Sequence, residues 1–283
     1  MRLQLIRHLW GIDEAWETSF PRIQAQGFTG IECPLPRSDD RDRFCALLSK
    51  HGFTYIPQIH TGGKTVAEHL ASFTALVEQA STYAPAFINC HSGSDLWSDA
   101  ENREYFTAAL ATERRIGVPV CHELHRGRIL FHPTPTRTAL LAFPDLKVCC
   151  DYSHWVVVCQ SLLEHQPDIF ALCAERAMHI HARVGYEHGP QVSDPRAPEF
   201  ARHLQVHEGW WSQIWDSQER RGMRTTTLAP EFGPPGYMHT LPYTNMPVAN
   251  LWDICYWQAE RQRQRFANRT AAMPAVTQAQ LHQ

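Results

Sequence analysis

The sequence lacks several features that define common classes of protein. It has no continuous apolar run of about 18 residues, so no membrane span is expected. Its formal net charge is −3, so it offers no broad basic surface for nucleic acid. Neither a GxGxxG turn nor a P-loop is present, which argues against the usual dinucleotide and nucleotide folds. These absences favour a protein that acts on a small molecule.

Cysteine pairs are also missing. The nine cysteines are scattered without a CxxC motif, and Cys90, Cys121, Cys149 and Cys150 lie within strand-like apolar runs. This pattern predicts buried, reduced thiols rather than a disulfide framework or a zinc knuckle. The opening segment MRLQLIRHLWGIDEAW is interrupted by charged residues, unlike a signal peptide. We therefore expect a cytoplasmic protein.

What the chain does have is a regular alternation of strand-like and helix-like segments. Hydrophobic residues make up 43% and charged residues 19%, as in globular proteins. The expected strands are residues 3–6, 28–33, 53–59, 86–90, 118–121, 148–150, 177–181 and 225–228, with helices between them. The pattern predicts an α/β fold, a single (β/α)8 TIM barrel over residues 1–268, followed by a loose tail at 269–283. An open doubly wound sheet is the competing architecture.

Acidic and histidine side chains follow four successive strands. Asp151 ends the strand in LKVCCDYSHW, and Glu123, His181 and Glu231 hold matching positions in VCHELHR, MHIHARV and APEFGPP. In a parallel barrel such residues are neighbours on one rim. Each alone could be a helix cap or a surface group, but together they bring a charge of about −3 that a closed site tolerates only with a cation. Oxygen-rich ligands with one imidazole favour Mn²⁺, Mg²⁺ or Co²⁺ over a structural zinc.

The surrounding motifs resemble those of a known family. Arg126 follows the first glutamate by three residues, His154 follows the aspartate by three, and the metal-site histidine is the second of the pair His179-Ile180-His181. In these features the chain resembles the xylose isomerase-like barrel superfamily, and within it the ketose 3-epimerases. The resemblance is specific over roughly residues 118–233.

The resemblance implies a divalent-metal-dependent isomerase or epimerase of a small sugar or polyhydroxy ketone. It implies one ion, with Mn²⁺ expected first, held by Glu123, Asp151, His181 and Glu231. The two glutamates would be the catalytic pair, exchanging a proton with carbon through an enediolate intermediate. A metal-dependent lyase or dehydratase could use the same enolate chemistry. The resemblance also implies a homo-oligomer.

Substrate-binding candidates come from the same rim. They are His154, Arg183, Arg126, His60, His91 and Trp10. His154 could instead pack behind Asp151, and His60, His91 and Trp10 could each be an ordinary core or loop residue. Arg183 departs from the epimerases, which usually carry an acidic residue at this position. The long loops at residues 184–209 and 232–247 also differ, which leaves the substrate and the reaction open.

Two readings from other classes stay open. Apurinic-site endonucleases share the superfamily barrel, and the 17 histidines of this chain could supply the extra ligands of a metal cluster. The second alternative is a non-catalytic, sugar-binding barrel without a metal, but the presence of all four candidate ligands argues against it. Trp210, Trp211 and Trp215 have helical spacing and indicate packing or a subunit contact.

Overall fold

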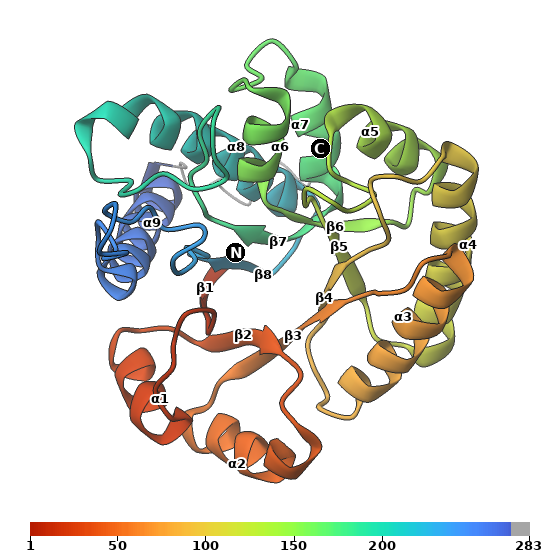
Figure 1. The fold of residues 1–283 in the computed structure, drawn as a ribbon, viewed down its shortest axis with the longest axis horizontal. Coiled ribbons are helices and arrows are strands. Elements are labelled where there is room, and N and C mark those ends of the chain that lie inside the picture. The colour runs from red at the N-terminus through yellow and green to blue at the C-terminus, as the bar shows by residue number, and fades with distance from the viewer. Residues whose placement is uncertain (273–283) are drawn as a thin grey trace, which may run out of the picture.

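The computed structural model describes residues 1–272 and shows a closed barrel of eight parallel strands surrounded by helices (Figure 1). Each strand pairs with its neighbours in the sequence, and the first pairs with the last. The strands are β1 (Arg2–His8), β2 (Gly30–Pro34), β3 (Thr54–His60), β4 (Ile88–His91), β5 (Val120–Glu123), β6 (Lys147–Cys150), β7 (Ala177–His181) and β8 (Thr225–Ala229). The predicted TIM barrel is confirmed.

The helices form the outer ring, as Figure 1 shows. They are α1 (Trp16–Ala25), α2 (Arg41–His51), α3 (Val66–Ser81), α4 (Asp99–Ile116), α5 (Pro133–Ala142), α6 (Tyr152–Cys159), α7 (Pro167–Arg176), α8 (Ala201–Arg220) and α9 (Leu251–Ala272). Local sequence explains their ends. Thr65 and Ser98 open α3 and α4 with capping boxes, and Gly52 and Gly117 close α2 and α4 in the left-handed conformation.

Three expected boundaries differ from the structure. The sequence predicts a helix over residues 156–173 with a break near Pro167, and the structure has two helices there: α6 starts earlier, at Tyr152, and ends at Cys159, where Gln160 is left-handed, and α7 begins at Pro167. The loop expected over 184–209 is shorter, since α8 begins at Ala201. The final helix continues to Ala272, past the expected end at residue 268, and the rest of the expected tail, residues 273–283, lies outside the described residues.

The interior of the barrel is layered because side chains of a strand alternate between its two faces. One layer is apolar and contains Ile6, Ile56, Cys121, Cys149 and Ala229. Two residues further along, the same strands or the residues just after them carry polar side chains. These are His8, Gln58, Glu123, Asp151 and Glu231, all buried. The fold therefore places a polar layer directly above an apolar one, at the carboxyl ends of the strands.

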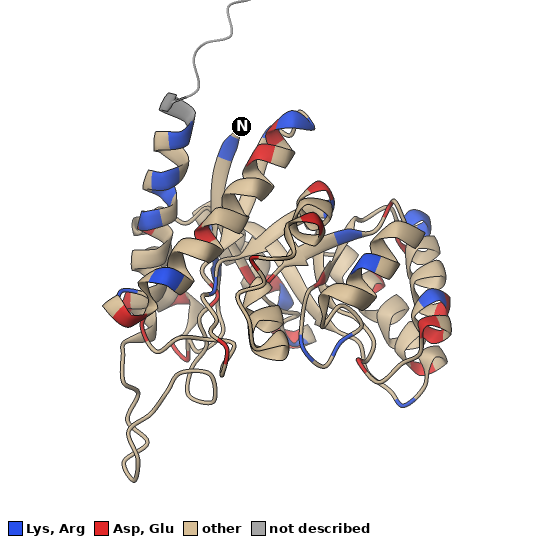
Figure 2. Cartoon of the chain, turned by 90° about the horizontal axis from the view of Figure 1, so that it is seen from above, with Lys and Arg blue, Asp and Glu red and all other residues tan. Residues whose placement is uncertain are grey.

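The outer face of the barrel packs against the helices in the main hydrophobic core. Trp210, Trp211 and Trp215 are part of it, with exposures of 6%, 0% and 1%, so the packing interpretation of these residues is right. They give no support to a subunit contact, and the homo-oligomer stays a prediction. All nine cysteines are free thiols. Basic and acidic residues are both present on the outer helices, and α9 carries Arg261, Arg263, Arg265 and Arg269 in succession (Figure 2). No helix within residues 1–272 has the length and apolarity to cross a bilayer.

Gly30 gives a test of the interior packing. A Cβ at this position would lie 2.6 Å from Ile6 Cδ1 and 2.7 Å from the Thr54 carbonyl oxygen. Overpacking of this kind typically costs about 1–3 kcal/mol, so Gly30→Ala should lower the free energy of unfolding by that amount. Gly209 lies in α8 with open space around it, and Gly209→Ala should raise stability by about 0.5–1 kcal/mol. Denaturant titration of both variants measures the difference, and an equal effect would contradict the layered packing.

Candidate active site at the carboxyl ends of the strands

The four side chains expected to hold a metal converge at one point. Glu123 ends β5, Asp151 and Glu231 follow β6 and β8, and His181 ends β7. All four are buried, and each offers a ligand atom within 4.8 Å of the others. From Nδ1 of His181 the distances are 2.8 Å to Glu231 Oε2, 3.6 Å to Glu123 Oε2 and 4.0 Å to Asp151 Oδ2.

These atoms suit a divalent cation. Within residues 1–272, Glu123 Oε1, Glu231 Oε2 and His181 Nδ1 are buried without a hydrogen-bond partner of acceptable geometry. Buried polar atoms are rarely left in this state unless a ligand or water satisfies them. Carboxylate oxygens and one imidazole nitrogen are ligands that Mn²⁺ and Mg²⁺ accept. The donor set therefore fits the metal that the sequence predicts.

Glu32, which the sequence reasoning did not assign to the site, fixes the orientation of His181. Its carboxylate lies 3.0 Å from Nε2 of both His179 and His181, and Asn89 donates to it at 3.0 Å. With Nε2 hydrogen-bonded to Glu32, His181 turns Nδ1 toward the three acids. Burial by itself raises the pKa of Glu32, but the two imidazoles hold it well below its usual range. Its position at the end of a strand was the available signal, the same one that identified the other acids.

Arg183 is a second organising residue, and it is buried. Its guanidinium pairs with Asp151, lies 3.4 Å from Glu231 Oε2, and contacts Nε2 of His154 at 2.8 Å. Burial raises the pKa of Asp151 to about 6, and the neighbouring arginine opposes that rise. Arg183 therefore offsets one of the negative charges of the cluster.

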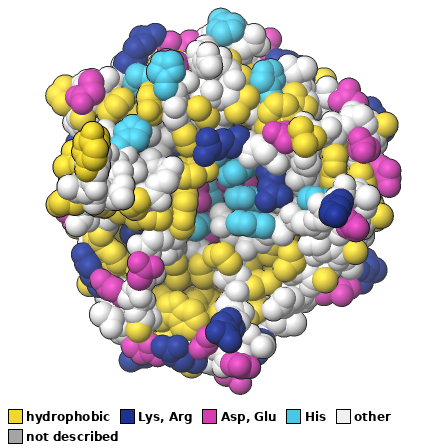
Figure 3. Space-filling model, in the orientation of Figure 1, with side chains coloured by type: hydrophobic (Ala, Val, Ile, Leu, Met, Phe, Trp, Pro, Cys, Tyr) yellow, Lys and Arg dark blue, Asp and Glu magenta, His cyan; other side chains and the backbone are white. Residues whose placement is uncertain are grey.

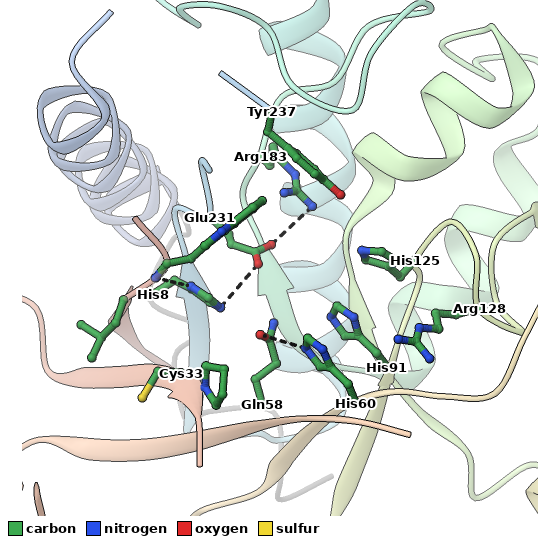
Figure 4. A pocket seen from close by; sticks show the side chains of 13 residues that line it. His8, Cys33, Gln58, His60, His91, His125, Arg128, Arg183, Glu231 and Tyr237 are labelled. Atoms are coloured by element: carbon green, nitrogen blue, oxygen red, sulfur yellow. Dashed lines mark hydrogen bonds and ion pairs between the residues drawn. The ribbon is translucent and has the colours of Figure 1, made fainter. Parts of the chain in front are cut away.

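A cavity of about 460 Å³ opens above the cluster at the centre of the barrel mouth. Figure 3 shows histidines gathered in this hollow, and Figure 4 shows the side chains that point into it. Of the predicted substrate-binding residues, Trp10, His60, His91 and Arg183 line the cavity, together with Glu231. Lining residues that the sequence reasoning did not assign include His8, Gln58, Arg128 and Tyr237.

The other two predicted substrate-binding residues are not among the lining residues. His154 is fully buried behind Arg183, 3.7 Å from Asp151 Oδ2. Arg126 lies over the ring of Tyr237, with 5.0 Å between its guanidinium carbon and the ring centre. The structure therefore places both next to residues that line the cavity rather than in its wall.

Imidazole rings form one wall. The ring centres of His60 and His91 are 4.1 Å apart, those of His91 and His125 are 4.3 Å apart, and those of His125 and His154 are 3.9 Å apart. Burial lowers the pKa of His60 to about 4 and that of His125 to about 3, so both are neutral at physiological pH. A neutral imidazole has one N–H donor and one acceptor nitrogen. When the N–H donates to another group of the protein, the acceptor nitrogen can face the cavity, where it could accept a hydrogen bond from a hydroxyl group of a polyol.

An aromatic pair forms the opposite wall. Trp10 and Tyr237 meet edge to face with 4.8 Å between ring centres. Gly233 makes this arrangement possible, because a Cβ there would lie 2.3 Å from the Trp10 ring. The cavity thus combines an acceptor-rich wall, an apolar wall and the acidic cluster beneath them.

Comparison with known proteins identifies the fold. No family model matches the sequence, and no curated protein gives a match. Among solved structures, an AP endonuclease of family 2 from Brucella melitensis is 17% identical, with a TM-score of 0.59 over 83% of this chain and 94% of that one. A probable 3-DHS dehydratase, AsbF, from Bacillus anthracis is 13% identical, with a TM-score of 0.61 over 93% and 99%.

A third neighbour is 3-keto-D-glucoside 4-epimerase YcjR from E. coli, 12% identical, with a TM-score of 0.59 over 93% of this chain and 100% of that one. At these identities the likeness concerns the fold. The chain shares with these three structures the closed (β/α)8 barrel that its alternating strands and helices predict. Proteins of this fold carry out more than one reaction, so the reaction must be argued from the site.

The metal-binding prediction can be tested directly. We expect the protein to bind one divalent ion per chain, measured by elemental analysis after equilibration with Mn²⁺. Asp151→Asn should lower the affinity sharply because an amide oxygen is a weaker ligand than a carboxylate. Glu32→Gln should lower it by roughly 10–100-fold, since it releases the ring of His181. Glu78→Gln, at an exposed ion pair with Arg115, is the matched control and should bind normally. Unchanged metal content in single variants of all four ligands would refute the assignment.

Proposed function

We propose that this protein is a divalent-metal-dependent isomerase or epimerase of a small sugar or polyhydroxy ketone. The observation that carries the proposal is the convergence of Glu123, Asp151, His181 and Glu231, with buried ligand atoms that lack a hydrogen bond of acceptable geometry, beneath a cavity whose wall is rich in hydrogen-bond acceptors. Mn²⁺ is the expected ion, and Mg²⁺ or Co²⁺ fits the same ligands. When bound, the ion supplies Lewis acid chemistry that acidifies the carbon next to a carbonyl.

The residues of the chain supply the proton transfers. Glu231 faces the cavity and lies 3.5 Å from Nε2 of His8, whereas Glu123 lies deeper, 2.9 Å from Nε2 of His91. Burial opposes ionisation of both, but the neighbouring His181 and other cationic groups keep their pKa values below the usual range, at about 2 for Glu231. In this proposal Glu231 is the base that takes the proton from the carbon next to the carbonyl, giving an enediolate and a protonated Glu231. Epimerisation would then need Glu123 to carry a proton of its own, taken from solvent, and to donate it to the opposite face of that carbon.

The remaining polar groups would bind the substrate. Arg183 lines the cavity between Asp151 and Glu231, where it can neutralise charge that develops on a substrate oxygen. His60 and His91 would accept hydrogen bonds from hydroxyl groups, and Trp10 would cover the apolar face of the substrate. His154 holds Arg183 and so acts on the substrate indirectly.

A lyase or dehydratase is the second candidate, and one observation favours it. Of the two glutamates, only Glu231 is among the residues that line the cavity within the described part of the chain. Removal of a proton followed by loss of a leaving group needs one base on one face, and it does not need a second residue to reprotonate the carbon. The probable dehydratase among the structural neighbours has the same fold.

An endonuclease is the third candidate. His91, Glu123 and His125 form a second group whose ligand atoms lie within 4.8 Å of one another, as a metal cluster would need. The net charge of −3 argues against a broad nucleic-acid surface. We therefore expect a small-molecule substrate and no nucleic-acid partner.

Deuterium exchange tests the shared proton-abstraction step. With Mn²⁺ and a panel of ketoses, keto-sugars and cyclitol ketones in D₂O, NMR should show deuterium entering the carbon next to the carbonyl of a turned-over substrate. Glu231→Gln should slow this exchange by roughly 10²–10⁴-fold, the usual contribution of a general base. The same change at Glu123 should abolish product formation. Glu78→Gln should exchange at the normal rate. Turnover without deuterium incorporation would refute the roles of both glutamates.

The products separate the candidates. A new stereoisomer identifies an epimerase, an aldose–ketose pair identifies an isomerase, and an unsaturated ketone identifies a lyase. His154→Ala should keep the metal and lose rate or substrate affinity, because it removes a support of Arg183 rather than a ligand.

Abasic DNA provides the contrasting test. Duplex DNA with an abasic site should show neither binding nor cleavage at physiological salt, measured by gel shift and by strand scission. Phosphate binding depends on clustered Lys and Arg that are free to pair with it, whereas the chain has a net charge of −3 and Arg183 at the barrel mouth is paired with Asp151 and Glu231. Cleavage that weakens steeply with added salt and disappears in Asp151→Asn would instead establish the endonuclease.

A further inference from the structure

A second depression lies outside the barrel wall, separate from the cavity above the metal site. It has a volume of about 770 Å³ and is bounded by residues 11–14 after β1 and by residues 247–252 at the start of α9. No residue lines both this groove and the central cavity. Arg7 lies at its base, and Arg22, Glu14 and Trp252 lie along its sides.

Arg7 is a buried cation with no counter-charge. Its exposure is 2%, and within residues 1–272 its side chain makes no hydrogen bond and no ion pair, while Nε is fully buried without a partner. Its contacts are aromatic, with the guanidinium carbon 4.9 Å from the ring centre of Trp252 and 6.0 Å from that of Phe28. Arginine is almost never buried unless it is paired, because an unpaired buried charge is costly.

The geometry of β1 explains why the side chain of Arg7 is buried, but it does not explain why that side chain carries a positive charge. Ile6 and His8 point into the barrel, so Arg7 between them points outward into the layer between β1 and the helices. An aliphatic side chain would fill that space without the cost of a buried cation. The guanidinium is therefore better explained by something that it binds in the groove.

The first residues of α9 also suit a negatively charged ligand in this groove. The first N–H groups of a helix have no partner within the helix, and they carry partial positive charge. Asn250 accepts from the N–H of Asp253 at 3.1 Å, which leaves the N–H groups of Leu251 and Trp252 as donors beside the groove. Backbone donors at a helix start and an unpaired arginine are together a site for an oxyanion.

The other charges of the groove define its outer edge. Arg22 stacks on Trp252 at 3.7 Å and pairs with Glu14 at 3.6 Å, so its charge is largely balanced. Asp13 and Glu14 are exposed to solvent, where water screens them. Arg7 is the charge that stays uncompensated.

We propose that this groove binds a small oxyanion, a phosphate or a carboxylate group, through Arg7, the start of α9 and Arg22. The site also adjoins the wall of the central cavity. Leu9 and Trp10 line the cavity while residues 11–14 line the groove, and Gly11 packs against Leu251 and Pro234 so closely that a Cβ would lie 2.6 Å from Leu251 Cδ2. A bound anion therefore ties the loop that carries Trp10 to α9.

The test measures the binding of inorganic phosphate by calorimetry at constant ionic strength, using the protein as purified. We expect one saturable site per chain. Arg7→Met should weaken binding by about tenfold or more, because it removes a charge-assisted hydrogen bond. Glu14→Gln should strengthen it several-fold by freeing Arg22, and Arg22→Gln should weaken it. Arg41→Met, an exposed arginine over Tyr83, is the matched control and should bind as the parent does. Asp151→Asn should also bind as the parent does, which separates this site from the metal centre.

Melting temperatures distinguish an Arg7 that binds a ligand from an Arg7 that only stabilises the fold. Without added anion, Arg7→Met should melt at or above the temperature of the parent protein, since an unpaired buried charge is replaced by an apolar side chain. Phosphate should raise the melting temperature of the parent and not that of this variant. Comparing acetate, inorganic phosphate and glycerol phosphate identifies the class of anion.

Two results would overturn the proposal: no saturable binding by the parent protein to any of the three anions, or equal binding by the parent and Arg7→Met. If Arg7→Met fails to fold, the opposite effects expected of Glu14→Gln and Arg22→Gln decide the question. None of these measurements depends on turnover, so they are independent of the proposed enzyme activity.

Discussion

The concentration of negative charge inside the barrel requires cations and hydrogen-bond donors in the residues around it. Glu32, Glu123, Asp151 and Glu231 are all buried at one end of a closed sheet, and Arg183 is the fixed cation that pairs with two of them. Such a cluster is costly unless cations and hydrogen bonds compensate it. The imidazoles around the cluster compensate part of this charge, and the ligand atoms without partners show where compensation is incomplete. A divalent ion is the simplest group that completes it.

The barrel produces this cluster by a simple repeat. A residue two places beyond an inward-facing apolar residue also faces inward, one layer closer to the mouth, so Cys121, Cys149 and Ala229 are followed by Glu123, Asp151 and Glu231. The apolar layer closes the floor and keeps water out from below. Polar chemistry is thereby confined to the open end, where the loops can shape a substrate.

Because this repeat is visible in the sequence, the barrel and the convergence of Glu123, Asp151, His181 and Glu231 at its rim could be predicted from the strand ends. Glu32 could have been found by the same rule, but no partner motif marked it, and its contact with His181 joins residues far apart in the chain. Pro167 marks the division between α6 and α7 in the sequence, whereas the start of α8 at Ala201 was missed because residues 201–209 fall within the expected loop. The places of His154 and Arg126 depend on side-chain packing against Arg183 and Tyr237, which spacing does not encode.

The asymmetry between the two glutamates bears on the reaction. Glu231 meets the cavity directly, whereas Glu123 is covered by His91, whose ring belongs to the stacked histidine wall. A substrate that reaches both carboxylates must therefore lie deep, against the metal ligands, with His91 beside it. A substrate held higher in the cavity would meet Glu231 alone. Under the proposed function, the depth at which the substrate binds would therefore decide between proton transfer across the carbon and elimination from one face. The histidine wall and the Trp10–Tyr237 pair line the cavity above Glu123 and are the side chains that a substrate would pass to reach it.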